Sequence, residues 1–195
     1  MKNEQSRQKI VILNLVVIGV VCLEKTSLTV QEVLRFSNHD LLNHLNLIQM
    51  NLDLNRVDEA KQVIHDVAEM CKTFSMTNKL GLPKTSLWLQ TFKWQYGAIE
   101  LHLSCNIETA VNHTWDETIE QYLEKTMIHV YETLDPFVEQ KLQLHINSKQ
   151  DTLMLHFHLQ GKWASEPTEL LQTKLNVTWH EWSHQSWHYE ISLKE

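Results

Sequence analysis

The sequence predicts an α+β protein in which an N-terminal α-helical hairpin precedes a domain of mixed helices and strands. Residues 29–54 and 57–78 repeat apolar side chains every three or four positions, as amphipathic helices do. Beyond the Gly-Leu-Pro boundary at 81–83, apolar residues instead alternate in several short runs, as strands do. The expected regions are an N-terminal hydrophobic segment at 1–27, a helical hairpin at 28–80 and an α+β domain at 84–195.

The composition excludes several classes of function. The chain has 195 residues and a formal net charge of −7, so we expect no nucleic-acid partner. Its four glycines are scattered, and the glycine-rich loops that cradle nucleotide phosphates are absent from the sequence. The three cysteines lie far apart and suggest neither a disulfide framework nor a metal-binding pair. A reducing compartment fits this pattern, and we expect a cytoplasmic location.

The hydrophobic run IVILNLVVIGVVCL at residues 10–23 complicates that location. It is shorter than the roughly 20 apolar residues that a membrane-spanning helix needs, and no small-x-small cleavage site follows it. Three interpretations stay open: an inefficient membrane anchor, a buried helical extension, or an over-called start codon. Membrane association through residues 10–23 is therefore expected as one alternative. The basic residues before the run favour an external body, which conflicts with the function inferred below.

The helical hairpin is predicted to dimerise. The seam of the first helix comprises Leu34, Leu41, Leu45, Ile48 and Leu52. The seam of the second helix comprises Val57, Ala60, Ile64, Val67, Cys71 and Phe74. One hairpin cannot bury both seams well, whereas two hairpins packed as a four-helix bundle can, so we expect a homodimer. The alternative is a hairpin covered by the C-terminal half of its own chain.

The rest of the chain is predicted to form an antiparallel-rich sheet with helices on one face. A helix is expected at 85–96 and a strand at 99–107. Thr114 and Glu117 have the spacing of a capping box for a helix that runs to about Leu134. The further elements expected are strands at 141–147, 152–160, 175–182 and 186–193, and a short helix after Pro167.

One histidine stands apart in the first helix, in the stretch FSNHDLLNHLNLIQMNL. At about 100° per residue, His39 points roughly 140° away from the apolar seam, so it is not a core histidine. Asp40 follows it directly, and Asn43 lies one helical turn further on. The broad face around it also carries Phe36, Asn46, Leu47, Met50 and Leu54. A largely apolar patch around a histidine is typical of a docking surface.

The chemistry of this trio fits phosphoryl transfer. A neutral imidazole can attack phosphorus and form a phosphoramidate, which gives the phosphoryl group up again. Asp40 is the candidate acceptor for the proton on the other ring nitrogen, and Asn43 can hydrogen-bond a phosphoryl oxygen or a water. The helix supplies no phosphate-binding cation. We therefore expect no cofactor of the chain's own, with magnesium brought by the partner.

The segment HDLLN also matches the H-(D/E)-x-x-(N/T) phosphoacceptor motif of dimerising histidine-kinase helices. The stretch SNHDLLNHLNLIQMNLDL, the hairpin after it and the C-terminal half resemble the sporulation initiation phosphotransferase B family, over roughly residues 28–195. Weaker likenesses occur at LHFHLQGKWASEP and HYEISL. The resemblance implies a dimeric four-helix bundle followed by a domain like a degenerate histidine-kinase ATPase domain. It further implies a phosphorelay enzyme of sporulation initiation, which passes a phosphoryl group between aspartates of two response regulators through a histidine equivalent to His39.

The residues themselves also favour a domain that lacks an ATP site. The helix expected at 115–134 has no asparagine to hold magnesium, and the segment LQGKWASEP has only Gly161 where an adenine-binding loop needs several glycines. The predicted regulator contacts are Arg35, Phe36, Asn46, Leu47 and Met50. Two alternatives stay open: a sensor histidine kinase with an unrecognised ATP site, and a non-catalytic dimeric scaffold that sequesters a response regulator.

Other histidines recur in the C-terminal half, at positions 156, 158, 180, 184 and 188. The first two would share one strand face, as metal ligands can, but the last three span an expected turn. No acidic or cysteine pattern supports a metal site there, so none is predicted. The tryptophans nearby are expected to pack on the sheet.

Overall fold

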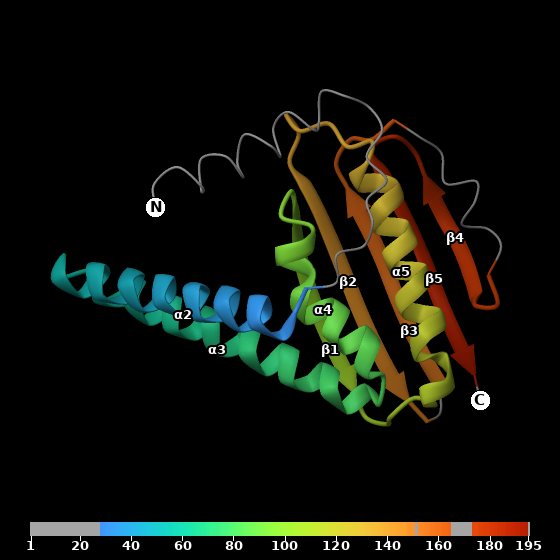
Figure 1. Ribbon diagram of the computed structural model, residues 1–195, viewed down its shortest axis with the longest axis horizontal. Helices are drawn as coiled ribbons and strands as arrows, with labels where there is room; N and C mark the ends of the chain where they lie inside the picture. The colour runs from blue at the N-terminus through green and yellow to red at the C-terminus, as the bar shows by residue number, and fades with distance from the viewer. Residues whose placement is uncertain (1–27, 151, 165–172, 195) are drawn as a thin grey trace. The chain divides into compact units, whose positions relative to one another are not determined.

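The computed structural model describes residues 28–150, 152–164 and 173–194 (Figure 1). The hydrophobic run at 10–23 and the short helix expected after Pro167 lie outside these residues. The chain divides into two compact units, Met1–Asn38 and His39–Glu195. Among the described residues, no helix has both the length and the apolar character needed to cross a bilayer.

In the first unit, the described residues form the start of helix α2, Val30–Asp53. The helix begins with a capping box made by Thr29 and Glu32. The Thr29 backbone N–H donates to Glu32 Oε2 over 2.9 Å, and the Glu32 N–H donates to Thr29 Oγ1 over 3.2 Å. These hydrogen bonds from Thr29 lower the pKa of the Glu32 carboxyl. The two side chains thereby satisfy backbone donors that a helix start leaves open.

In the second unit, the remainder of α2 and helix α3, Val57–Thr77, form the predicted helical hairpin. Asn55 in the connection has φ +56, a left-handed conformation that asparagine tolerates better than most residues. The Arg56 N–H donates to the carbonyl of Asn51 over 2.8 Å and closes the turn. The three-residue 3₁₀ helix η1, Asn78–Leu80, follows α3.

The predicted sheet is present and has five strands in the order β1-β2-β3-β5-β4. β1 pairs parallel with β2, and the other pairs are antiparallel. The sequence therefore predicted the mostly antiparallel sheet and the α+β class correctly, but not the parallel pairing of β1 with β2. The strands are β1 Ile99–Ile107, β2 Gln140–Lys149, β3 Thr152–Gln160, β4 Asn176–Trp182 and β5 Ser186–Lys194.

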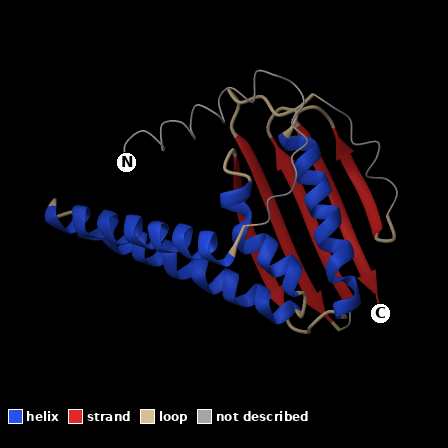
Figure 2. Ribbon diagram, in the orientation of Figure 1, coloured by secondary structure: helices blue, strands red, loops and turns tan. Residues whose placement is uncertain are grey.

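Helices α4, Pro83–Gln95, and α5, Asp116–Tyr131, cover one face of this sheet (Figure 2). Alternate strand residues point into the layer between them, which gives the strict in-and-out burial of β3 and β5. The carboxylate of Asp116 caps α4, because it accepts the N–H groups of Lys84 and Thr85 over 2.8 and 2.9 Å. The largest fully buried side chains include Phe92, Ile119, Leu123, Met127, Phe157, Trp187 and Tyr189.

One predicted helix start is wrong. A 3₁₀ turn, η2 His113–Trp115, precedes α5, and Thr114 does not cap the helix. Asn112 Oδ1 instead accepts from the N–H and hydroxyl of Thr114 over 3.1 and 2.9 Å. Glu117, the other half of the predicted box, accepts from Gln121 and Lys84. Asn112 stabilises this turn in place of Thr114, because its side-chain oxygen can accept from the N–H of the residue two positions further on.

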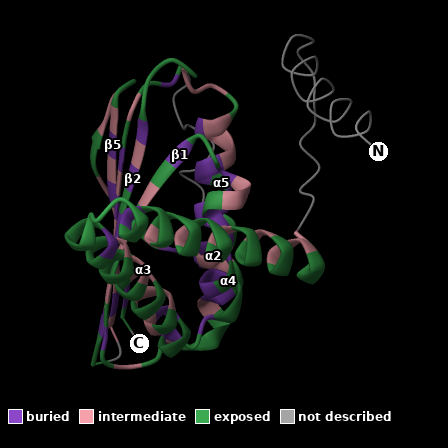
Figure 3. Cartoon of the chain, turned by 90° about the vertical axis from the view of Figure 1, so that its left-hand side faces the viewer, coloured by how far each residue is buried: buried purple, intermediate pink, exposed green. Residues whose placement is uncertain are grey.

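Burial differs sharply between the hairpin and the sheet domain (Figure 3). The C-terminal domain encloses a continuous core of aromatic and aliphatic residues. The hairpin leaves many large apolar side chains accessible in the single chain. In the second unit, those exposed by about half or more are Leu41, Leu42, Leu45, Met50, Leu52, Leu54, Val57 and Ile64.

Candidate functional site

His39 lies on helix α2 with its side chain 71% exposed. The helix places Asn43 one turn further along, within reach of the ring. Asn43 Nδ2 lies 3.1 Å from His39 Nδ1, so the amide and the imidazole form a hydrogen bond. The ring is therefore held on one side and open to an incoming molecule on the other.

The tautomer of His39 depends on how the Asn43 amide is turned. Where the Asn43 amide nitrogen donates, Nδ1 accepts and the ring proton sits on Nε2. Turning the amide about its last bond brings Oδ1 to the ring instead, so that Nδ1 donates and Nε2 has a free electron pair. Attack on phosphorus by Nε2 requires this second arrangement.

Asp40 points mainly toward helix α4. Its Oδ1 lies 3.7 Å from His39 Nδ1, which is beyond hydrogen-bonding distance. Its Oδ2 lies 2.5 Å from Lys93 Nζ and accepts the indole N–H of Trp94 over 3.0 Å. Partial burial alone would raise the pKa of the Asp40 carboxyl, but the hydrogen bonds from Lys93 and Trp94 and the charge of Lys93 bring it below its usual value. The carboxylate therefore stays ionised next to the histidine.

Sequence reasoning missed Lys93 and Trp94 as neighbours of the histidine. Trp94 lies 54 residues beyond Asp40, and no local motif links the two segments. Only the packing of α4 brings them together. The same residues line a shallow concavity of about 320 Å³, together with Asn43 and His44.

The residues predicted to contact a regulator are accessible to different degrees. In the first unit, the Arg35 guanidinium carbon lies 5.0 Å above the Phe36 ring, and Phe36 is half-buried. In the second unit, Asn46 is exposed, and Leu47 and Met50 are 40% and 50% exposed. Regulator contact by these residues stays a prediction.

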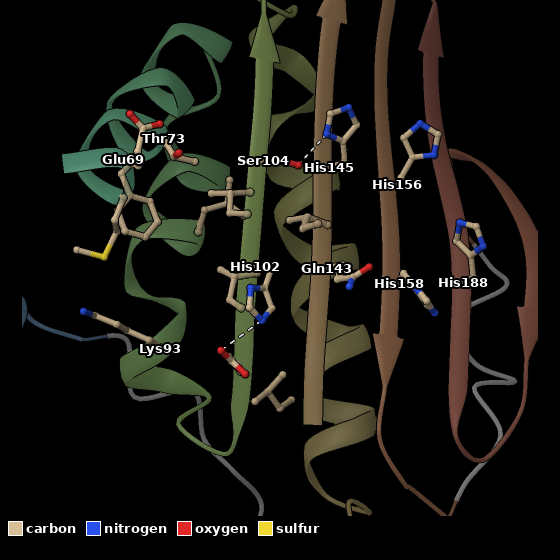
Figure 4. Close-up of a pocket in the computed structure, with 18 residues that line it drawn as sticks. Glu69, Thr73, Lys93, His102, Ser104, Gln143, His145, His156, His158 and His188 are labelled. Atoms are coloured by element: carbon tan, nitrogen blue, oxygen red, sulfur yellow. Dashed lines mark hydrogen bonds and ion pairs between the residues drawn. The ribbon is translucent and has the colours of Figure 1, made fainter. Parts of the chain in front are cut away.

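A larger concavity of about 980 Å³ lies along α3 and the sheet face that α4 and α5 leave uncovered (Figure 4). His145 and His156 face each other across neighbouring strands with ring centres 5.9 Å apart, and His158 and His188 do so at 5.4 Å. Over the described ranges, no three histidine, cysteine or acidic residues are grouped so as to hold a metal ion. His39 does not line this concavity.

The hairpin matches a known family. Residues 24–80 match the family model of the alpha-helical domain of SpoOB-type sensor kinases. The matched segment is therefore similar to that helical domain. The SpoOB-type segment includes His39, Asp40 and Asn43, whereas Lys93 and Trp94 come from the chain beyond it.

Solved structures of histidine kinases are similar at low identity. AdeS of Acinetobacter baumannii is 12% identical, over 80% of this chain and 97% of that one, with a TM-score of 0.40. The catalytic domain of ThkA is 11% identical, over 60% and 91%, with a TM-score of 0.37. The blue-light activated kinase EL346 of Erythrobacter litoralis is 12% identical, over 87% and 61%, with a TM-score of 0.39. No curated protein matches the chain in sequence.

Proposed function

We propose that this chain is a phosphorelay phosphotransferase that moves a phosphoryl group between aspartates of two response regulators through His39. The observation that carries the proposal is the open imidazole on the SpoOB-type helix, paired with Asn43 and next to an ionised Asp40. The resemblance to the sporulation phosphotransferases supports a role in sporulation initiation. The exposed apolar residues of the hairpin support a homodimer with two such sites.

The transfer balances without a further reactant. In the first step, the electron pair on His39 Nε2 attacks the phosphorus of the donor regulator's aspartyl phosphate. The N–P bond forms, the P–O bond breaks, and the donor carboxylate leaves with the bonding electrons. In the second step, an acceptor aspartate attacks phosphorus and the N–P bond breaks. The proton on Nδ1 stays in place through both steps, so no general base is needed.

The side chains around the ring have different tasks in this scheme. The phosphorylated ring with a proton on Nδ1 is cationic, and the Asp40 carboxylate stabilises that charge. In its turned position, the Asn43 amide oxygen accepts a hydrogen bond from Nδ1–H, and the uncharged amide does not repel a phosphoryl oxygen. The magnesium that neutralises the phosphoryl oxygens belongs to the regulator. The accessible Leu47 and Met50 provide apolar surface for its docking.

The direct test is labelling of the full chain by receiver domains that have been loaded with acetyl phosphate. Wild type is expected to acquire acid-labile, base-stable phosphate, and His39→Gln is expected to lose it completely. His65→Gln is the matched control, because His65 is exposed on α3 and is also followed by an aspartate, yet lacks an amide one turn on. Labelling that survives in His39→Gln would show that the site is wrong.

Two further measurements separate the alternatives. A sensor kinase would label His39 directly from radiolabelled ATP and magnesium, and we expect no such labelling. A non-catalytic scaffold would bind a regulator equally well in wild type and His39→Gln and would never carry phosphate. Stable binding without any labelling of wild type would favour that scaffold.

A further inference from the structure

Helix α4 contributes two side chains to the immediate surroundings of the phosphoacceptor, and neither belongs to the SpoOB-type segment. Lys93 Nζ and the Trp94 indole nitrogen both contact the same oxygen of Asp40, Oδ2, at 2.5 and 3.0 Å. The other oxygen, Oδ1, is the one that faces His39. The carboxylate is therefore held from one side by α4 and directed to the ring with its other side.

The geometry restricts the rotation of this carboxylate. Two donors on one oxygen fix both the position and the plane of the group, because either donor alone would still allow it to swing. The Lys93 ammonium also lies 5.3 Å from the centre of the Trp94 ring, so the two donors restrain each other. Asp40 is 29% exposed in its side chain, which limits competition by water.

The charges favour one tautomer of His39. An ionised carboxylate oxygen near Nδ1 attracts a proton at that nitrogen, which leaves the electron pair on Nε2. At 3.7 Å, Asp40 Oδ1 does not hydrogen-bond Nδ1, but its charge favours a proton on that nitrogen, and the turned Asn43 amide oxygen can accept a hydrogen bond from it. A freely rotating Asp40 would share its oxygens between the ring and water and would favour this tautomer less.

We propose that Lys93 and Trp94 are positioning residues of the transfer site: they hold Asp40 so that its Oδ1 selects the Nδ1–H tautomer of His39. The inference rests on the proposed function for its purpose, but the tautomer can be measured without any regulator. If these contacts only joined α2 to α4, replacing Lys93 or Trp94 would leave the tautomer of His39 unchanged.

The test uses full-length protein with ¹⁵N-labelled histidine and long-range proton–nitrogen correlation spectra, in which His39 is assigned from its absence in His39→Gln. We expect the Nδ1–H form to predominate in wild type. Lys93→Met and Trp94→Phe should shift the ratio toward Nε2–H, and Lys93→Arg should restore it because it keeps a donor and a charge. Lys84→Met is the matched control, since Lys84 is on the same helix and pairs with Glu117, a residue of α5, over 3.1 Å.

A second readout uses potassium phosphoramidate as a donor that needs no partner protein. Its P–N bond breaks, ammonia leaves, and the N–P bond to His39 forms. Lys93→Met should load about tenfold more slowly, as expected when a group that orients the nucleophile is released. Lys93→Arg and Lys84→Met should stay within about twofold of wild type. Circular dichroism checks that each variant is folded, and Trp94→Phe decides the matter if Lys93→Met does not fold.

The two hypotheses fail separately. If the tautomer ratio of His39 is the same in wild type, Lys93→Met and Trp94→Phe, the positioning inference is wrong, whatever the regulators do. An unchanged loading rate in Lys93→Met overturns it as well. If no loaded receiver domain transfers phosphate to wild type, the proposed function fails, while a shifted tautomer still supports the contact argued above.

Discussion

The proton on the His39 ring decides whether Nε2 carries an electron pair for attack. Two side chains compete to set it: Asn43, whose amide can donate or accept, and Asp40, which can only accept while ionised. An amide and a carboxylate on the same side of one ring give it two arrangements that differ by a single bond rotation. Such a pair suits a carrier that must both take up and release its phosphoryl group.

His188 lies next to other histidines on the sheet. Burial and then the nearby His180, His158 and His156 lower the pKa of His188, with Glu181 opposing them. The unfolded chain therefore binds more protons at this residue than the folded chain between its folded pKa and about 6.5. Its contribution to stability is complete above that value and is lost as the pH falls through the folded pKa.

We therefore expect acidification from pH 7.5 to pH 5.5 to destabilise the wild type more than His188→Gln. Urea unfolding at the two pH values measures both free energies of unfolding. His113→Gln is the control, because His113 lies exposed on η2 and apart from this row of rings. Equal losses in wild type and His188→Gln would contradict the expectation.

At the scale of the elements, Gly161 directly follows β3 and lies against Gln140, the first residue of β2. A Cβ at this position would lie 1.7 Å from Oε1 of Gln140. Gln140 cannot move aside easily, because its amide is buried and hydrogen-bonds the carbonyls of Asp135 and Val138 and the N–H of Lys162. Gly161→Ala should lower the free energy of unfolding by about 1–3 kcal/mol.

Gly97 provides the comparison for this substitution. A Cβ there would lie 3.6 Å from the carbonyl oxygen of Lys93, an ordinary contact. Gly97→Ala should therefore change stability by less than about 1 kcal/mol, in either direction. Urea unfolding of both variants measures the difference. If the two substitutions cost the same, the space around Gln140 is not the reason for the glycine.

The sequence was sufficient to predict those helices and strands that show a regular apolar periodicity of their own. The alternation at 99–107 predicted β1 with its observed ends, and the 3.6-residue period predicted both hairpin helices. Capping was less predictable, because several nearby polar residues can satisfy the same N–H groups. Asn112 serves the turn where Thr114 was expected to cap, whereas Thr29 and Glu32 form a capping box that periodicity alone did not reveal.

The site was predictable only as far as it is contained in one helix. His39, Asp40 and Asn43 follow from helical spacing, and the structure brings the amide and the ring together as that spacing requires. Their functional roles stay predictions. Lys93 and Trp94 depend on how α4 packs against α2, which no short-range pattern encodes. The sequence therefore indicates a candidate nucleophile but not what controls its proton.

At the scale of the whole molecule, the C-terminal domain buries its apolar side chains, whereas the hairpin leaves many of them exposed in the single chain. Leu45 and Ile64 are 52% and 53% exposed in the single chain, on the two helices whose seams repeat at three and four residues. Apolar surface of this extent in a regular stripe is costly in water and is typical of an interface. Two hairpins packed as a four-helix bundle would cover it and would complete a homodimer with two copies of His39.

The proposed dimer is expected to dissociate in Leu45→Glu combined with Ile64→Glu, because two like charges per chain would enter the bundle interior without partners. Light scattering after size-exclusion chromatography measures the mass of each form. Leu87→Glu is the control: Leu87 is 57% exposed on α4, outside the hairpin, so a charge there should leave the dimer intact. A monomeric wild type at micromolar concentration would refute the bundle. Dissociation by Leu87→Glu would place the interface on the C-terminal domain instead, and His39 would then need a different surface for its regulators.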